Sequence, residues 1–288
     1  MHSEQNEYHI TLSELTDILA NTGVDVYSLK HFNKGWDFDV YLLNDSKILR
    51  VPRRIAVEAR LRDEISILEL IRGNPWVYVP DYQIIIGGNE GSPTVTGYPI
   101  FKGQPFNVLT DDKSVISDVI KFTSWLHRIH GQHKIILGNT TNLSEYREDA
   151  KTAYLSIRSE LEPHTCSAFD KYFSWTIPHC NAKVIIHNDL RTDHILVNSS
   201  QVAIIDWTDI AWAYPWEEFL WWWLFWGDEI FHVLENHYDG WREEWVDCIR
   251  FVGTWKVVLE YYYGLQTHNE HKLLFAKQAL RNNYLSND

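Results

Sequence analysis

The feature that most constrains the fold is an apolar run, Phe219 to Trp226, in which four of the eight residues are tryptophan. As a helix this run would be apolar on nearly every side, which requires deep burial. A membrane-spanning helix needs about 20 such residues, and the sequence contains no apolar window of that length. The run must therefore be enclosed by the chain itself. A chain of 288 residues is long enough for one large domain, or for two lobes, with a sizeable core.

The excess of acidic over basic residues restricts the kinds of ligand that we expect this chain to bind. Lys and Arg total 26 against 39 Asp and Glu, which gives a formal net charge of −13. Nucleic-acid-binding proteins normally present a basic surface, so we expect no nucleic-acid partner, whereas an acidic chain is compatible with a cationic small molecule. The three cysteines are scattered and form no disulfide framework. The first ten residues lack the basic and apolar regions of a secretory signal. We therefore expect a cytoplasmic protein with no membrane partner.

The pattern of apolar residues changes near residue 105. Before it, short strand-like runs dominate, including a hairpin in which Asp39–Leu43 and Lys47–Val51 flank the turn-prone Asn44-Asp45-Ser46. Two helices are predicted in this part, one over Thr11–Asn21, with Gly23 as its stop signal, and an amphipathic one over Glu58–Ile71. Beyond residue 105 the predicted elements are mainly helices, over residues 115–129, 144–161, 216–225, 241–263 and 271–282. The sequence therefore predicts an α+β chain with a small β-rich lobe, residues 1–101, and a larger, mostly helical lobe, residues 102–288.

The stretch from Val184 to Trp207 carries the strongest chemical signal. Three short apolar strands are predicted here, and the polar residues at their ends include Asp189, His194 and Asp206. We expect this arrangement to hold two carboxylates and an imidazole at one edge of a hairpin. One carboxylate can accept the proton of a hydroxyl group, and the other groups can bind a hard cation such as Mg²⁺. These parts suit phosphoryl transfer, in which positioning and charge neutralisation supply most of the catalysis.

The same stretch resembles a known catalytic loop. The motif HNDLRTDHILVN, followed by AIIDW, is similar to the HxDxxxxN or HxDxxxxH loop and the metal-binding aspartate of aminoglycoside and macrolide phosphotransferases. The resemblance extends to Gly35–Arg54, which looks like the nucleotide-loop hairpin and third strand of that family, and to Gly264–Leu280, which looks most like the tail of macrolide phosphotransferases. It covers most of the chain. It implies a protein-kinase-like, two-lobed fold and a Mg²⁺-dependent transfer of the γ-phosphate of ATP or GTP to a small-molecule hydroxyl.

The resemblance also implies roles for individual residues. Asp189 falls on the catalytic aspartate that accepts the hydroxyl proton, and His194 and Asp206 fall on the metal ligands. Arg50 takes the place of the third-strand lysine that contacts the phosphates, and Glu64 on the following helix is its partner. The other nucleotide-binding residues implied by the resemblance are Gly35 in the nucleotide loop, and Tyr98 and Ile100 in the hinge whose backbone meets the purine.

Four residues are expected to contact the acceptor: Trp207, Asp209, Trp212 and Glu218. By resemblance the acceptor is an antibiotic, and we favour the 2′-hydroxyl of a macrolide. A macrolide is bulky and apolar and carries one cationic amine, which suits an aromatic and acidic site. The alternatives are an aminoglycoside, whose several ammonium groups would use the acidic excess more heavily, and a metabolic alcohol such as a sugar or choline.

Two departures from the family pattern keep a further alternative open. Asn188 stands where the family has Gly, which reduces the freedom of the backbone. Arg50 replaces the compact charge of a lysine by a planar fork. A chain with these changes could be a catalytically silent, kinase-like binding protein, and stabilisation by nucleotide and Mg²⁺ would distinguish a nucleotide-binding enzyme from it.

Overall fold

The computed structural model describes residues 8–88, 92–106, 113–129, 137–174, 182–199, 201–281 and 283. The chain divides into two compact units. The first comprises residues 1–106 together with 193–209, and the second comprises residues 107–192 and 210–288. The segment that carries His194 and Asp206 therefore folds with the amino-terminal part of the chain. The predicted lobes, residues 1–101 and 102–288, stay a prediction.

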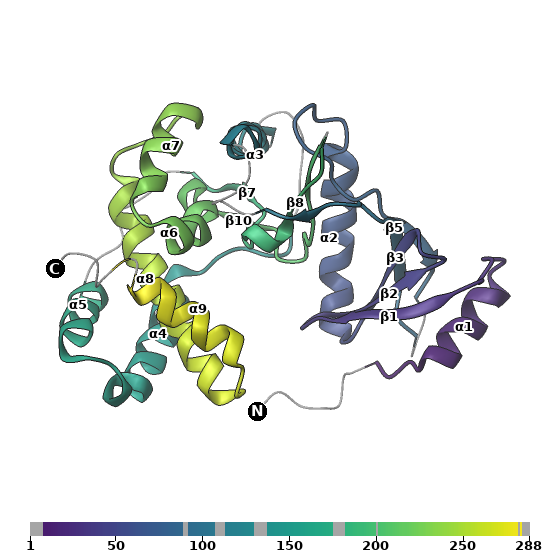
Figure 1. Ribbon diagram of the computed structural model, residues 1–288, viewed down its shortest axis with the longest axis horizontal. Coiled ribbons are helices and arrows are strands. Elements are labelled where there is room, and N and C mark those ends of the chain that lie inside the picture. The colour runs from purple at the N-terminus through teal and green to yellow at the C-terminus, as the bar shows by residue number, and fades with distance from the viewer. Residues whose placement is uncertain are drawn as a thin grey trace. The chain divides into compact units, whose positions relative to one another are not determined.

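The first unit is built on a five-stranded antiparallel sheet with the strand order β1-β2-β3-β5-β4 (Figure 1). Its strands are β1 (Leu29–Lys34), β2 (Phe38–Leu43), β3 (Lys47–Pro52), β4 (Gln83–Ile86) and β5 (Val95–Pro99). Two helices belong to it, α1 (Leu12–Asn21) before β1 and α2 (Ile55–Ile71) after β3. A small second sheet has the order β6-β8-β9 and consists of β6 (Gln104–Pro105), β8 (Ile195–Val197) and β9 (Val202–Ile204).

The turn between β2 and β3 sets the register in which these two strands pair. Asn44 and Asp45 both have positive φ angles, 52° and 50°, as the tightest hairpin turns require, and Asn and Asp tolerate this conformation better than most residues. The predicted hairpin is confirmed, and its register places Arg50 on β3 opposite Val40 of β2 and Thr96 of β5.

Helix α1 supplies the hydrophobic core on one side of this sheet. The helix begins with a capping box, in which Thr11 accepts a hydrogen bond from the backbone N–H of Glu14 and the Glu14 carboxylate bonds back to Thr11. Its buried leucines pack with apolar residues of three strands, and the cluster comprises Leu15, Leu19, Tyr41, Leu43, Leu49, Val51 and Val95.

The second unit is mostly helical. Its helices are α3 (Lys113–Leu126), α4 (Leu143–Ile157), α5 (Pro163–Phe173), α6 (Leu220–Trp226), α7 (Glu229–His237), α8 (Trp245–Gln266) and α9 (Glu270–Leu280). A two-stranded antiparallel sheet pairs β7 (Val184–Ile186) with β10 (Ala211–Ala213). The chain thus has the α+β architecture predicted from the sequence, a sheet-rich amino-terminal part followed by a mostly helical one.

The aromatic run forms part of the core of the second unit. It was predicted to lie within one helix over residues 216–225, but the structure has a 3₁₀ helix, Pro215–Phe219, followed by α6. Trp216 and Trp222 are completely buried. Gly253 of α8 permits this packing, since a Cβ atom there would lie only 2.5 Å from the Trp223 ring.

Helices α5 and α7 were not predicted from the sequence, and the predicted start of α8 lies four residues before the observed one. Helix α5 carries Pro163 in its first turn, a start signal that the sequence analysis did not use. Helix α7 is short and amphipathic, and it buries Ile230 and Leu234 on one face. Helix α8 begins at Trp245 and not at residue 241, because residues 241–244 precede it as a loop and turn.

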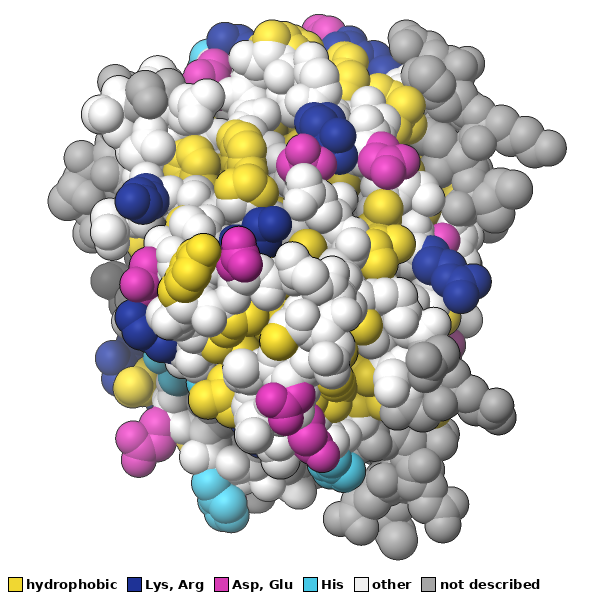
Figure 2. Space-filling view, turned by 90° about the vertical axis from the view of Figure 1, so that its right-hand side faces the viewer, with side chains coloured by type: hydrophobic (Ala, Val, Ile, Leu, Met, Phe, Trp, Pro, Cys, Tyr) yellow, Lys and Arg dark blue, Asp and Glu magenta, His cyan; other side chains and the backbone are white. Residues whose placement is uncertain are grey.

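The surface of the described part carries charges of both signs. On the face shown in Figure 2, acidic and basic side chains are interspersed, and they do not gather into a field of one sign. None of the helices in the described part of the chain is long and apolar enough to cross a membrane.

Candidate active site

A buried ion pair joins strand β3 to helix α2 in the first unit. Arg50 Nη1 lies 2.6 Å from Glu64 Oε1, and the two residues are only 4% and 0% exposed. The Tyr82 hydroxyl donates to the same Glu64 oxygen at 2.8 Å and accepts a hydrogen bond from Arg50. The Arg50 guanidinium also lies 3.8 Å above the centroid of the Phe38 ring. A buried charge is costly unless it is paired and hydrogen-bonded. These contacts satisfy Oε1 of Glu64, whereas Oε2 has no hydrogen-bond partner among the residues that the structure describes, and burial raises the pKa of Glu64.

The electrostatics of this pair make Arg50 a permanent cation. Burial acts to lower the pKa of Arg50, but the carboxylate of Glu64 and, with a smaller effect, that of Asp206 outweigh it, and the pKa is raised well above its ordinary value. The guanidinium therefore keeps its charge whenever the protein is folded.

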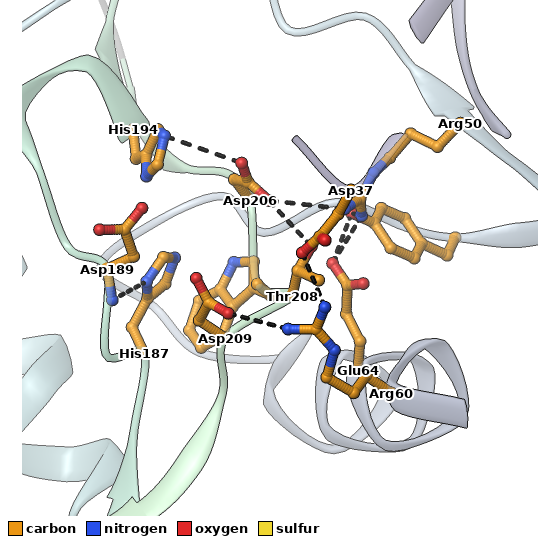
Figure 3. Close-up of polar contacts among 12 residues, drawn as sticks. Asp37, Arg50, Arg60, Glu64, His187, Asp189, His194, Asp206, Thr208 and Asp209 are labelled. Carbon is orange, nitrogen blue, oxygen red and sulfur yellow. Dashed lines mark hydrogen bonds and ion pairs between the residues drawn. The ribbon is translucent and has the colours of Figure 1, made fainter. Parts of the chain in front are cut away.

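The segment that follows β9 completes this cluster. Thr208 Oγ1 donates to Asp206 Oδ1 at 3.0 Å, and Arg50 Nη2 lies 2.5 Å from Thr208 Oγ1 and 3.4 Å from Asp206 Oδ1. The other carboxylate oxygen, Oδ2, lies 3.7 Å from His194 Nε2. The Asp206 side chain is 48% exposed, whereas Thr208 is buried. Figure 3 shows Asp206 between His194 and Arg50.

The loop that follows β7 holds Asp189 in the second unit. The buried carboxylate of Glu218 accepts hydrogen bonds from the backbone N–H groups of His187 and Asn188, at 2.7 and 3.1 Å. The N–H of Asp189 donates to His187 Nδ1 at 3.3 Å. Asn188 has a φ angle of 69°, a left-handed conformation that Asn adopts more readily than most residues with a side chain. Asn188 thus meets the backbone requirement for which the resembling family uses Gly.

The nucleotide loop predicted at Gly35 is a tight turn between β1 and β2. The Gly35 N–H donates to Phe38 O at 2.9 Å, and a Cβ atom at Gly35 would lie 3.1 Å from that oxygen, so a side chain would be crowded. Trp36 in this turn is 75% exposed, and the Arg54 guanidinium lies 5.4 Å from its ring centroid. The turn is fixed from the end of β3, because Arg53 Nη1 donates to Gly35 O at 3.0 Å.

Charged residues tie this turn to α2 and to the segment beyond Asp206. Asp37 in the turn pairs with Arg54 and, at 2.8 Å, with Arg60 of α2. Arg60 Nη1 also lies 3.1 Å from Asp209 Oδ1 (Figure 3). Asp209 was predicted to contact the acceptor, and its half-exposed carboxylate already has a cationic partner in Arg60.

The two predicted hinge residues have different surroundings. Tyr98 is a buried residue of β5 that stacks on Tyr82 with ring centroids 5.0 Å apart. The Ile100 N–H donates to Ser46 O at 2.9 Å. Since that amide is already used, a purine at this hinge would have to meet other backbone groups of the segment. The nucleotide-binding roles of Tyr98 and Ile100 stay predictions.

Burial argues against two of the predicted acceptor contacts. Trp207 is 0% exposed, and its indole N–H donates to Ile204 O at 3.0 Å. Glu218 is 1% exposed, and its two oxygens accept the backbone hydrogen bonds described above. Neither side chain has a face open to an acceptor, so we revise both roles to internal ones. Trp212, on β10, is partly exposed and stays a prediction.

The residues near Asp206 fit a hydrated cation. In the described part of the chain, no group of three or more His, Cys, Asp and Glu residues could hold a metal ion by itself. Mg²⁺ does not need such a group, because it is usually held by one or two carboxylates together with water and phosphate oxygens. Asp206 offers a half-exposed carboxylate with Oδ1 already fixed by Thr208, and His194 lies beside Oδ2.

The sequence did not predict several residues that surround Arg50 and Asp206. Phe38 and Tyr82 enclose Arg50 although they lie far from it in the sequence, and no motif marks them. Thr208 lies two residues after Asp206, and a hydroxyl so close to the aspartate that is predicted to bind the metal was a signal that could have been used. Arg60 lies near Glu64 on α2, and nothing in the sequence distinguishes it from the other charged residues of that helix.

Comparison with known proteins gives the family of the chain. Residues 28–246 match the model of the phosphotransferase enzyme family. A curated relative, the uncharacterized protein YcbJ of Bacillus subtilis (strain 168), is 24% identical over 254 residues, which are 79% of this chain and 81% of that protein.

Solved structures share the fold. The GDP complex of wild-type aminoglycoside 2′-phosphotransferase-IIIa superposes with a TM-score of 0.79 at 19% identity, over 97% of this chain and 100% of that one. Macrolide 2′-phosphotransferase MphH from Brachybacterium faecium superposes with a TM-score of 0.63 at 21% identity, over 93% and 97% of the two chains. The α+β, kinase-like fold predicted from the sequence is thereby confirmed. With the family model matching three quarters of its length, the chain belongs to the phosphotransferase enzyme family.

Proposed function

We propose that this phosphotransferase is a small-molecule kinase that moves the γ-phosphate of ATP or GTP to a hydroxyl group with the help of Mg²⁺. The observation that carries the proposal is the chain of contacts from Glu64 through Arg50 and Thr208 to Asp206. It places a permanent cation and a half-exposed carboxylate next to each other in the first unit, as binding of a metal-bound polyphosphate requires. A protein that consumes ATP or GTP in this way is expected in the cytoplasm.

The roles of the individual residues follow from their chemistry. Asp189 would accept the proton of the attacking hydroxyl, and the loop around it is held by Glu218. Asp206 and His194 would hold Mg²⁺, which when bound neutralises charge on the transferred phosphoryl group. Arg50 has both Nη atoms engaged by Glu64, Tyr82 and Thr208, so we assign it first to holding α2 and the Asp206 segment together.

We propose a hydroxylated, cationic antibiotic as the acceptor. The preference for a macrolide relied partly on Trp207 and Trp212 as an apolar contact surface, and the burial of Trp207 removes one of them. The acidic balance of the chain suits a macrolide amine and equally the several ammonium groups of an aminoglycoside. The solved relatives named above include phosphotransferases of both substrate classes.

A screen by mass spectrometry tests the reaction and its acceptor together. The purified chain is incubated with Mg²⁺, ATP or GTP, and macrolides, aminoglycosides or small alcohols, and each acceptor is examined for the added mass of one phosphoryl group. Asp189→Asn should lower turnover by roughly 10²- to 10⁴-fold while nucleotide binding persists. Asp193→Asn, which changes an exposed carboxylate of the same loop, is the matched control and should stay near wild type. Wild-type turnover in Asp189→Asn would refute the assigned base.

The alternative of a catalytically silent binding protein has a separate test. A nucleotide that binds the folded state raises its melting temperature by mass action. We expect Mg²⁺ with ATP or GTP to do so here, because the first unit offers the Arg50 cation beside the half-exposed carboxylate of Asp206. No shift with either nucleotide would count against the kinase.

A further inference from the structure

We propose that Thr208 is a positioning residue for Asp206, and that its hydroxyl fixes one carboxylate oxygen and so holds the carboxylate in one orientation toward a divalent cation. The inference rests on the proposed function and concerns a residue outside the family motif quoted above. All the side chains involved belong to the first unit, and they are joined by hydrogen bonds and ion pairs between 2.5 and 3.7 Å.

The direction of each hydrogen bond at Thr208 follows from its partners. A guanidinium can only donate, so the Thr208 oxygen accepts from Arg50 Nη2 at 2.5 Å. The single hydroxyl proton is then directed to Asp206 Oδ1 at 3.0 Å, because an ionised carboxylate can only accept. The Thr208 hydroxyl therefore accepts a hydrogen bond from the charged guanidinium of Arg50 and donates one to Oδ1 of Asp206.

This bond leaves the two oxygens of Asp206 in different environments. Oδ1 receives the Thr208 hydroxyl and faces Arg50 at 3.4 Å. Oδ2 lies 3.7 Å from His194 Nε2, in a side chain that is half exposed. A cation approaching Asp206 would therefore bind Oδ2 and not both oxygens, with His194 beside it.

Thr208 also acts as a spacer between Arg50 and Asp206. Without the hydroxyl, Arg50 Nη2 would lose an acceptor, and its nearest remaining carboxylate oxygen is Asp206 Oδ1. The ion pair between these two groups already stands at 3.4 Å, and if it shortened it would compete more strongly with the cation for the carboxylate. The backbone of Asp206 is itself unusual, with a φ angle of 60°, so the segment needs contacts such as these to hold its conformation.

The protein offers a matched control for removal of a buried hydroxyl. Thr96 lies opposite Arg50 on β5, is completely buried, and its Oγ1 has no hydrogen-bond partner in the part of the chain that the structure describes. Thr96→Val thus removes the same atom as Thr208→Val, from a neighbouring buried position, without breaking a hydrogen bond. Thr208→Ser keeps the hydroxyl and removes only the methyl group.

The test measures cation binding without relying on turnover. Mn²⁺, as a paramagnetic substitute for Mg²⁺, is titrated into each variant in the presence of GDP or ADP, and free Mn²⁺ is followed by electron paramagnetic resonance. Thr208→Val should weaken Mn²⁺ binding by roughly tenfold, which is what losing one hydrogen bond to a charged group typically costs. Thr208→Ser and Thr96→Val should remain within about twofold of wild type. Thermal unfolding without metal or nucleotide shows that each variant is folded.

The outcomes separate this inference from the function on which it rests. Mn²⁺ binding by Thr208→Val that equals the wild type would overturn the positioning role and leave the kinase proposal intact. An equal loss in Thr96→Val and Thr208→Val would also overturn it, because the effect would then belong to packing and not to the hydroxyl. A wild-type chain that binds no Mn²⁺ with either nucleotide would overturn the proposed function itself.

Discussion

Two buried carboxylates, one in each unit, are stabilised in different ways. In the first unit, Glu64 meets the guanidinium of Arg50 and the hydroxyl of Tyr82. In the second, Glu217 accepts hydrogen bonds through Oε1 from the Thr141 hydroxyl at 3.0 Å and the Tyr214 N–H at 2.8 Å. Burial dominates these weaker contacts and raises the pKa of Glu217 to about 7. Burial also raises the pKa of Glu64, against the lowering effect of Arg50. The two carboxylates thus differ in their partners: a cation in direct contact for Glu64, and neutral hydrogen-bond donors with the weaker influence of Lys183 and Lys256 for Glu217.

The largest loss of stability is expected when Arg50, the cationic partner of Glu64, is replaced by an uncharged residue. Arg50→Met leaves a buried carboxylate without its charged partner and should lower the free energy of unfolding by about 3–5 kcal/mol. The double variant Arg50→Met/Glu64→Leu removes both charges and should recover most of that loss, since a well-packed apolar pair can replace a buried ion pair. Urea unfolding at neutral pH measures both. If the double variant is as unstable as Arg50→Met, the pairing is not what the arginine contributes.

A smaller effect is expected from Glu218, the neighbour of Glu217. Both of its oxygens accept backbone N–H groups, from His187 and Asn188. In Glu218→Gln the amide nitrogen must face one of these N–H groups, so one bond is lost, at a cost of about 1–3 kcal/mol in stability. We also expect a lower kcat, because the loop with Asp189 loses an anchor.

Glu217→Gln is the matched control for that variant. The hydrogen bonds recorded for Glu217 both use Oε1, and a glutamine oxygen can accept both. Unfolding curves and steady-state kinetics of the two variants at pH 7 make the comparison. Equal losses of kcat would contradict a specific role of Glu218 in holding the loop.

The smallest effect depends on pH and concerns Glu217 itself. The folded chain binds a proton at Glu217 up to about pH 7, whereas the unfolded chain releases it near pH 4.5. This proton therefore contributes stability that is fully present below pH 4.5 and is lost as the pH rises through 7. Glu217→Gln should match the wild type near pH 4.5 and be more stable at pH 8, by at most about 3 kcal/mol. Melting temperatures of both proteins across this range provide the check, and parallel curves would rule out a buried titration at this position.

The sequence predicted elements and motif positions better than side-chain surroundings. The pairing of Arg50 with Glu64 was implied by the family resemblance, and the structure joins the two side chains at 2.6 Å. Trp207 and Glu218 lie beside the same motif but are buried, because proximity in sequence does not say whether a side chain points inward. The enclosure of Arg50 combines Phe38 of the neighbouring strand β2 with Tyr82, which lies 32 residues further along the chain, and no local pattern encodes the contact with Tyr82.

The exposed tryptophan of the β1–β2 turn has an optical consequence. Trp36 is open to solvent, whereas Trp207, Trp216 and Trp222 are sealed in the interior. A collisional quencher such as acrylamide therefore reaches the fluorescence of Trp36 and leaves that of the buried rings almost unchanged. Because Trp36 lies in the turn that we assign to the nucleotide, a bound phosphate group there would shield it from the quencher. Several other tryptophans of the described residues are partly exposed, so the signal of the turn is the part of the quenching that disappears in Trp36→Phe.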